Sequence, residues 1–207
     1  MAEITCMCEH KFTADIPAEV DIGAAPALLE EISDGSFMNV TCPACGTVLK
    51  PEFRVHITNS RTGWDIDFIP ELERREYLKH IPAADPSSVR RTVIGYPELV
   101  EKIACFKDGL SDQVVEYLKY FIFSKVFDTT ENDEKDVTVY YYEKRGTDLV
   151  YHIHGLKEDE VALFKIADST YKKALKDINT HMEEEPFNEF LIPPYVSLSR
   201  LSSWSDL

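Results

Sequence analysis

Alternating apolar and polar residues predict strands in the first eighty residues of the chain. Apolar side chains recur at every second position in residues 12–16, 53–57 and 64–68. Successive side chains of a strand point to opposite faces, so this period of two predicts half-buried strands. Between the first two runs, Pro26 can open a short helix and Gly35 can end it. The pattern therefore predicts a small antiparallel sheet with one helix beside it.

A different pattern begins after residue 80. Residues 81–92 contain two prolines and a pair of serines, which do not favour a regular element. We therefore predict a first domain at residues 1–80 and a linker at residues 81–92.

Residues 93–183 carry helical spacing first and strand-like spacing later. Leu99, Ile103 and Phe106 recur at helical intervals, and residues 114–123 are apolar on nearly every side, which predicts a helix enclosed by others. Strand-like runs follow at 137–142, 149–154 and 161–166, and a last helix begins near residue 168. This order predicts an α+β domain with two packed helices, a three-stranded meander and a helix.

Two segments of this second half lack an apolar period. The acidic run 128–136 is expected to be a solvated loop, and Pro193-Pro194 predicts an extended tail over residues 184–207, in which Trp204 is one candidate anchor. The predicted fold class is therefore α+β: a small antiparallel, zinc-ribbon-like sheet module followed by a helical and meander domain.

The first domain also contains two closely spaced pairs of cysteines, which bear on its function. Cys6 and Cys8 form one pair, and Cys42 and Cys45 form the other. Short spacing places two sulfur atoms on one turn, and four converging thiolates suit a tetrahedral Zn²⁺ ion. Gly46 favours such a turn because glycine accepts a positive φ. We predict that these four cysteines bind one structural zinc ion.

Alternatives remain open at this cluster. The Cys-x-Cys pair is shorter than the usual spacing and is followed by Glu9 rather than glycine, so His10 could replace one of its sulfur atoms. The thiols could also serve redox chemistry. Four thiolates leave no open position on the metal for substrate or water, which favours a structural ion over a catalytic one.

The charge of the chain bears on its partners. The net charge is -15, and residues 1–60 contain three basic and nine acidic residues. Phosphate backbones require clustered lysine and arginine, so we expect no nucleic-acid binding; Arg74-Arg75 and Arg90-Arg91 are the exceptions to consider. The start of the chain has no basic and apolar leader, and no apolar run approaches the length of a membrane span, so we expect a cytoplasmic protein that does not bind membranes.

The remaining candidate residues favour structural roles. His152 and His154 share one face of a predicted strand but have no obvious third ligand, and Cys105 is expected to be a buried apolar residue. The chain contains no phosphate-binding glycine loop, zinc-protease helix or nucleophile elbow. We therefore expect a non-enzymatic protein.

Several short motifs of the chain resemble one known family. Those motifs are Ile4-Thr5-Cys6, Phe12, Ile16-Pro17, Leu28-Leu29, Phe37, Thr41-Cys42-Pro43-Ala44-Cys45-Gly46, Arg91-Thr92-Val93-Ile94-Gly95 and matching positions from Glu98 to Tyr120. Together they resemble the CpXC domain family, which is named for two Cys-Pro-x-Cys motifs. The second motif is intact here, and the first lacks one residue and its proline. The resemblance implies a metal-binding fold and a prokaryotic source, but no activity.

These observations give a hypothesis for the role of the chain. We predict a cytoplasmic zinc-binding protein that acts as an interaction or adaptor module with an unidentified protein partner. The alternatives are a thiol-based redox protein and a nucleic-acid-binding zinc ribbon, and the acidic first domain disfavours the second of these.

Overall fold

The computed structural model describes residues 1–82, 88–127 and 137–202. The predicted acidic loop at residues 128–136 and Trp204 lie outside these described residues. The described helices include none that is long and apolar enough to cross a bilayer.

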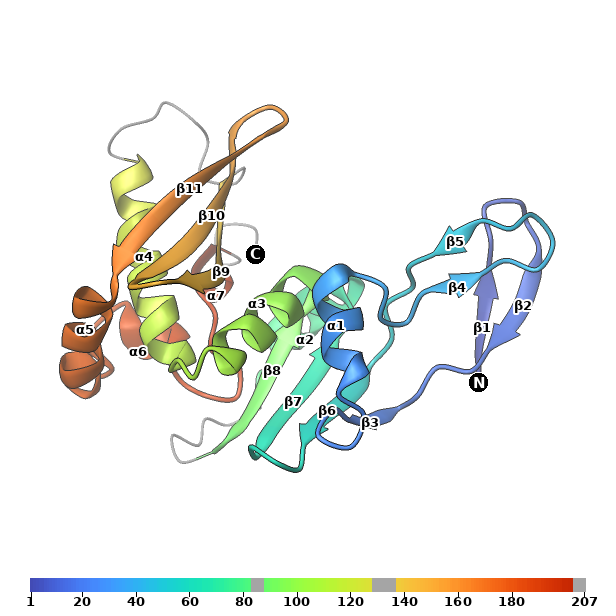
Figure 1. Cartoon of the computed structure of the whole chain (residues 1–207), viewed down its shortest axis with the longest axis horizontal. Coiled ribbons are helices and arrows are strands. Elements are labelled where there is room, and N and C mark those ends of the chain that lie inside the picture. Colours follow the sequence, from blue (N-terminus) through green and yellow to red (C-terminus); the bar gives the residue numbers. More distant parts are fainter. Residues whose placement is uncertain (83–87, 128–136, 203–207) are drawn as a thin grey trace.

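Four short strands form two hairpins at one end of the elongated molecule (Figure 1). β1 (Ala2–Thr5) pairs with β2 (Lys11–Ala14), and β4 (Val40–Thr41) pairs with β5 (Val48–Leu49); both pairs are antiparallel. These two hairpins are called the cysteine module below, because the turn of each one carries a cysteine pair.

A mixed four-stranded sheet forms the middle of the molecule. Its strand order is β3-β6-β7-β8, where β3 is Glu19–Asp21, β6 is Val55–Asn59, β7 is Trp64–Ile69 and β8 is Arg90–Ile94. The predicted alternation in β6 and β7 produces an antiparallel hairpin, while both outer strands pair in parallel. Parallel neighbours come from distant chain segments, so local periodicity could not have revealed this sheet.

Two helices pack against this sheet and complete its core. α1 (Ala27–Asp34) follows Pro26 and ends at Gly35, whose φ of 81° is left-handed, as the two residues predicted. α3 (Gly95–Lys107) contributes Leu99 and Ile103 to the same apolar core as Ile57 and Phe68 of the sheet. The core of the first part therefore extends beyond residue 80.

The structure corrects part of the predicted linker. Arg90–Ile94 is the strand β8. It pairs with β7, and the register places Asp65 opposite Arg90 at one end and Ile69 opposite Ile94 at the other. Thr92, Val93 and Ile94 are buried. The sequence did not predict this short strand, because it directly follows the prolines and serines and only three of its residues are apolar or buried. The division of the chain into domains at 1–80 and 93–183 stays a prediction.

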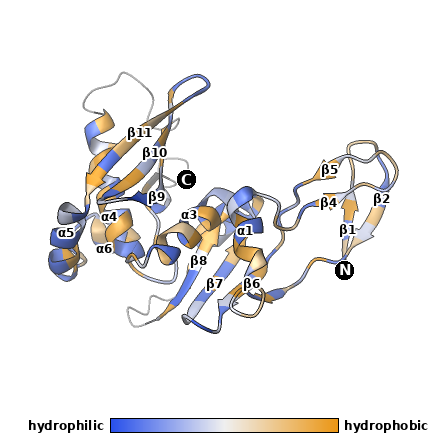
Figure 2. Ribbon diagram, viewed as in Figure 1, coloured by the Kyte–Doolittle hydropathy of each residue, from blue (hydrophilic) through white to orange (hydrophobic). Residues whose placement is uncertain are grey.

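The other end of the molecule is a helical and meander layer (Figure 1). The strands are β9 (Thr138–Arg145), β10 (Asp148–Lys157) and β11 (Glu160–Ala167), in the antiparallel order β11-β10-β9 that the sequence predicts for a meander. α4 (Asp112–Phe127) and α5 (Asp168–His181) pack with this sheet around a second apolar core. Figure 2 shows α5 as a largely hydrophilic helix, in keeping with its place on the surface.

The predicted extended tail contains short helices and buried residues. α6 (Phe187–Phe190) and α7 (Ser199–Ser202) lie in it, and Phe190, Tyr195 and Val196 are almost completely buried. Short helical turns of four residues leave little periodicity to detect. The remaining elements are a 3₁₀ turn at Glu71–Glu73 and α2 (Arg74–Lys79).

Candidate metal centre

The four predicted cysteines converge in the cysteine module. One sulfur atom from each of Cys6, Cys8, Cys42 and Cys45 lies within 4.8 Å of the others. The Sγ atoms of Cys6 and Cys45 are 3.6 Å apart, and those of Cys8 and Cys42 are 3.8 Å apart. These two contacts therefore join the two hairpins.

The first turn reaches this geometry without a glycine. The amide of Cys6 donates a hydrogen bond of 2.9 Å to the carbonyl oxygen of His10, and the amide of Glu9 donates one of 2.9 Å to Cys6. Glu9 has a φ of 67°, which non-glycine residues rarely adopt. The turn thus takes the left-handed step expected of a cysteine knuckle at the position where glycine is absent.

The second turn has the same form with favourable residues. The amide of Cys42 donates to the carbonyl oxygen of Thr47, and the amide of Gly46 donates to that of Cys42, both at 2.9 Å. Gly46 has a φ of 75°, as its position after Cys45 predicts. Each hairpin therefore holds its two sulfur atoms on one side of a closed turn.

The spacing of the sulfur atoms fits a tetrahedral metal site. With a Zn–S distance of about 2.3 Å, tetrahedral geometry separates two sulfur ligands by about 3.8 Å. The separations of 3.6 and 3.8 Å agree with this value and are far longer than a disulfide bond of about 2.05 Å. All five cysteines of the chain are free thiols. The four thiols of the cluster therefore form a donor set that could hold one metal ion.

Hydrogen bonds within the cluster give two of its thiols different pKa values. Hydrogen bonding with the hydroxyl and amide groups of Thr47 lowers the pKa of Cys45 to about 6, and the Cys45 sulfur atom lies 3.2 Å from the Thr47 hydroxyl oxygen. At Cys8, a backbone bond at His10 lowers the pKa, but the neighbouring thiols raise it to about 12. A bound metal would require all four thiols to lose their protons.

His10 does not join the cluster. Its ring stacks along Phe12, with ring centroids 6.1 Å apart and planes at 14°. Among the described residues, the group able to hold a metal ion here consists of the four cysteines. The geometry therefore favours Cys6 and Cys8 over the alternative in which His10 replaces one of them.

The other sequence candidates lie apart from this centre. The thiol of Cys105 is buried 3.6 Å from the carbonyl oxygen of Leu110, and burial raises its pKa well above the ordinary value. The rings of His152 and His154 share one face of β10, as expected, with centroids 6.3 Å apart. The ring of His152 stacks on Tyr142 at 4.0 Å. The described residues provide no third ligand beside the two histidines.

A network of buried charges between α3 and α4 was not predicted from the sequence. Its members are Glu98, Glu101 and Lys102 of α3 and Asp112, Glu116 and Lys119 of α4. The Nζ atom of Lys119 lies 2.9 Å from carboxylate oxygens of both Glu101 and Glu116, and that of Lys102 lies 2.8 Å from Asp112. Burial raises the pKa of Glu101 to about 7, although Lys119 opposes this shift.

The same network fixes the C-terminal segment. Glu98 accepts hydrogen bonds from the Tyr195 hydroxyl at 2.8 Å and from Arg74 at 2.9 Å, and Glu116 accepts one from the Leu198 amide at 2.7 Å. These charges are partnered and buried, so they serve packing rather than a reacting ligand. A signal was available, because Glu116 and Lys119 stand three residues apart within the mostly apolar stretch 114–123 of α4.

The comparisons with known proteins show the family of the chain. The fold and the cluster define an α+β protein with a candidate metal centre of four cysteines. A family model described as "CpXC protein" matches residues 4–119, which include all four cysteines and both charged helices up to Lys119. The chain belongs to the CpXC family.

One relative covers nearly the whole chain. It is a protein of Treponema pallidum (strain Nichols) described as "Uncharacterized protein", 21% identical over 215 residues, which cover 95% of this chain and 96% of the relative. No solved structure matches the chain.

Proposed function

We propose that the chain binds one Zn²⁺ ion through Cys6, Cys8, Cys42 and Cys45, and that this ion stabilises the cysteine module as a protein interaction unit. The observation that carries the proposal is the convergence of the four sulfur atoms within 4.8 Å. Four thiolates favour Zn²⁺ among the common divalent ions and leave it no open position, so the ion is structural.

The small core of the module supports a structural role for the ion. Its buried apolar residues are Ile4, Cys6 and Cys42, and its strands are two to four residues long. A module with so few buried side chains gains most of its stability from a metal. The cytoplasm is the proposed compartment, since it keeps thiols reduced.

The exposed surface of the module supports a role in protein interaction. Met7 lies in the turn between Cys6 and Cys8 with 93% of its surface exposed, and Val48 on β5 is 56% exposed. Figure 1 shows the two hairpins of the module at one end of the molecule, projecting from its body. Exposed apolar side chains on a projecting element are a common feature of protein interfaces.

Metal analysis of purified protein tests the zinc site. We expect one zinc ion per chain in the native protein and less than a tenth of that in Cys42→Ser and Cys45→Ser variants. Cys105→Ser is the matched control, because its thiol lies outside the cluster, and it should retain full zinc. Native protein without zinc, or full zinc in both cluster variants, would show that the assignment is wrong.

A thiol-based redox role is the second candidate. The observation in its favour is the 3.6 Å separation of the Cys6 and Cys45 sulfur atoms, with Cys45 exposed to solvent. A mild oxidant separates the two functions. A zinc-loaded cluster should keep its metal and resist the oxidant, whereas a redox pair should form a Cys6–Cys45 disulfide that a thiol reductant reverses.

A further inference from the structure

The two edges of the meander sheet differ in how the fold covers them. At the β9 edge, the backbone amide of Tyr141 donates a hydrogen bond of 2.6 Å to Glu101, and the amide of Lys144 donates one of 3.0 Å to Asp108. Glu101 lies on α3 and Asp108 directly follows this helix, which packs against β9. The fold therefore closes this edge with a helix and two carboxylates.

The β11 edge has no such cover. β11 is an outer strand of the sheet and pairs with β10 along one side. In the part of the chain that the structure describes, no backbone or side-chain hydrogen bond reaches the other side of β11. The strand is eight residues long and contains neither proline nor glycine, the residues that interrupt strand pairing. Its row of unpaired N–H and C=O groups is available to a further strand.

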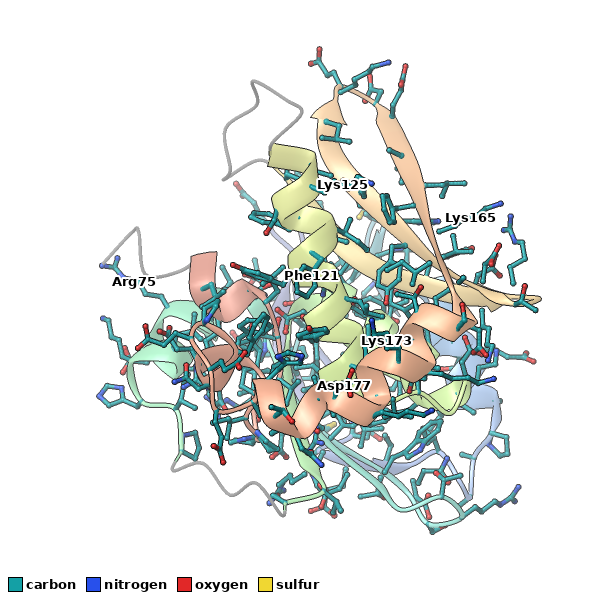
Figure 3. The ribbon with its side chains drawn as sticks, turned by 90° about the vertical axis from the view of Figure 1, so that its left-hand side faces the viewer. Arg75, Phe121, Lys125, Lys165, Lys173 and Asp177 are labelled. Carbon is teal, nitrogen blue, oxygen red and sulfur yellow. The ribbon has the colours of Figure 1, made fainter. Side chains whose placement is uncertain are left out.

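The neighbouring helices leave this edge open. A cavity of about 620 Å³, bounded by α4 and α5, lies beside residues 164–167 at the end of β11. Consecutive residues of a strand face opposite sides of the sheet, so a cavity that all four of these residues line lies along the strand edge. Figure 3 shows Lys165 of this strand apart from Phe121 and Lys125 of α4. The edge of β11 can therefore be reached from solvent.

The side chains beside this open edge are apolar. The outer face of β11 carries Val161, Leu163 and Lys165, because these residues alternate with Ala162 and Phe164, which pack against the core. Val161 is 47% exposed and Leu163 is 55% exposed. Natural edge strands often carry charged residues or proline, which prevent association. Two exposed apolar side chains on one face of an open edge strand therefore favour a partner strand that covers them.

β11 is complementary to itself in the antiparallel orientation. When Ala162 lies on a two-fold axis, opposite Ala162 of a second copy, each Val161 lies opposite Leu163 of the other chain. The same register brings Lys165 opposite Asp159 of the second copy, in the β10–β11 turn. Neither Lys165 nor Asp159 has an ion-pair partner among the described residues. Self-pairing thus places apolar side chains against one another and opposite charges together.

We propose that the open edge of β11 pairs with β11 of a second copy of this chain, in antiparallel orientation about a two-fold axis. The two meanders then form one continuous sheet, and the backbone groups of both open edges are satisfied at once. This self-association goes beyond the proposed zinc binding, because the cysteine module lies at the other end of the molecule and contributes no residue to the edge (Figure 1).

Sedimentation of the full-length chain provides the first test. The experiment is performed in a thiol reductant, so that disulfide bonds between chains cannot produce a dimer. We expect a dimer whose population rises with protein concentration. The proposal is wrong if the native chain stays monomeric at about 0.2 mM, where a dimer with a micromolar dissociation constant would be almost completely formed.

A charge exchange tests the register. Lys165→Glu places two carboxylates opposite each other and should weaken the dimer about tenfold, and Asp159→Lys should have the same effect by pairing two cations. The double variant restores opposite charges without changing the net charge and should return the native affinity. Lys176→Glu, on an exposed position of α5, is the matched control and should leave the dimer unchanged. Failure of the double variant to recover affinity would contradict this register.

A change on the apolar row tests the interface without altering the β10–β11 turn. Leu163→Lys should weaken the dimer at least about tenfold, because it places a cation opposite Val161 of the second copy. Leu175→Lys is the matched control, since Leu175 is 45% exposed on α5, away from the edge. A dimer that survives both Leu163→Lys and Lys165→Glu would place the interface elsewhere and overturn the proposal.

Hydrogen exchange identifies the surface that is covered. The amides of β11 should exchange more slowly in concentrated than in dilute protein, whereas those of β9 should not change. Dimerisation without added protection of β11 would show that another surface is used. A native chain that stays monomeric but binds a labelled peptide of residues 158–167 would show that the edge accepts a strand and not a second copy, which would also overturn the proposal.

Metal removal separates this proposal from the zinc proposal. Chain treated with a chelator should still form the dimer, because the edge of β11 contains none of the four clustered cysteines. Loss of the dimer on chelation, with full recovery when zinc is returned, would place the interface at the cysteine module and contradict pairing through β11.

Discussion

The ammonium group of Lys119 lies 2.9 Å from a carboxylate oxygen of Glu101, and both side chains are buried. The same ammonium group bonds Glu116 at an equal distance. Removing charged groups from water costs free energy. The arrangement is stable because hydrogen bonds satisfy each of the buried groups. The amide of Tyr141, for example, donates to the second carboxylate oxygen of Glu101 at 2.6 Å.

Replacement of the central cation should strongly destabilise the protein. We expect Lys119→Met to lower the free energy of unfolding by about 3 to 5 kcal/mol, because two buried carboxylates lose their counter-ion. Urea unfolding measured by circular dichroism reports this change. Lys157→Met is the control: it removes an exposed ion pair with Glu160 and should cost about 0 to 1 kcal/mol. Equal losses in the two variants would contradict a structural role for the network.

Acid should weaken the buried charge network between α3 and α4, because Asp112 becomes protonated. Burial raises the pKa of this carboxyl, but Lys102 and Arg91 lower it more, so it lies below its ordinary value of about 4. Its stabilising contribution is therefore complete above pH 4 and is lost as pH falls through the lower pKa of the folded protein. Asp112→Asn should be less stable at pH 7 and should lose less stability than the native chain between pH 5 and pH 2.

The control for this comparison is an exposed carboxyl. Asp159→Asn, in the β10–β11 turn, should leave both the stability at pH 7 and the slope of its acid dependence close to native. Unfolding in urea at several pH values measures both quantities. The interpretation fails if Asp112→Asn and the native chain lose stability in parallel.

The histidine beside the first cysteine pair should be dispensable for metal binding. Because the ring of His10 stacks on Phe12 outside the sulfur cluster, we expect His10→Ala to retain full zinc and Cys8→Ser to lose most of it. Metal analysis after gel filtration measures the difference. The reverse result would make His10 the fourth ligand.

The chain should not bind nucleic acid at physiological salt. Three of the four arginines that could form an exception pair with carboxylates: Arg74 with Glu71 and Glu98, Arg90 with Asp67, and Arg91 with Asp112. Cations already engaged in this way gain little from phosphate contacts. Mobility-shift assays with duplex DNA, single-stranded DNA and RNA test this expectation. Micromolar binding that is lost when Arg74, Arg75, Arg90 and Arg91 become alanine would contradict it.

The second half of the chain should need the central sheet. A fragment beginning at Val89 retains β8 but lacks β7, and it exposes Leu99 and Ile103, which pack with the sheet. We expect this fragment to unfold at a lower temperature than the full chain, or without a cooperative transition. A fragment with native-like thermal unfolding would instead support the domain boundary predicted at residues 81–92.

Local patterns predicted much of this fold and little of its long-range arrangement. The alternation in residues 53–57 and 64–68 is realised in β6 and β7, and Gly35 ends α1 as expected. The parallel pairing of β8 with β7 depends on contacts that no local period encodes. The burial of Tyr195 could not be predicted for the same reason, since its hydrogen-bond partners Arg74 and Glu98 lie far away in the sequence.

The candidate site was easier to predict than the sheet around it. Cysteine spacing is a chemical constraint, because two sulfur atoms on one turn must face the same way, and it identified all four members of the cluster. The form of the first turn was not predictable, because it depends on the left-handed φ of Glu9.

The separation of the cysteine pairs along the chain has a consequence for the unfolded protein. Cys8 and Cys42 are 34 positions apart, and the intervening loop contains β3 and α1, which belong to the central sheet and its core. A metal ion held by both pairs acts as a tether across this loop. By analogy with a disulfide, it removes conformational entropy from the denatured chain worth on the order of 4 kcal/mol. The ion would thereby favour the pairing of β3 with β6 without touching either strand.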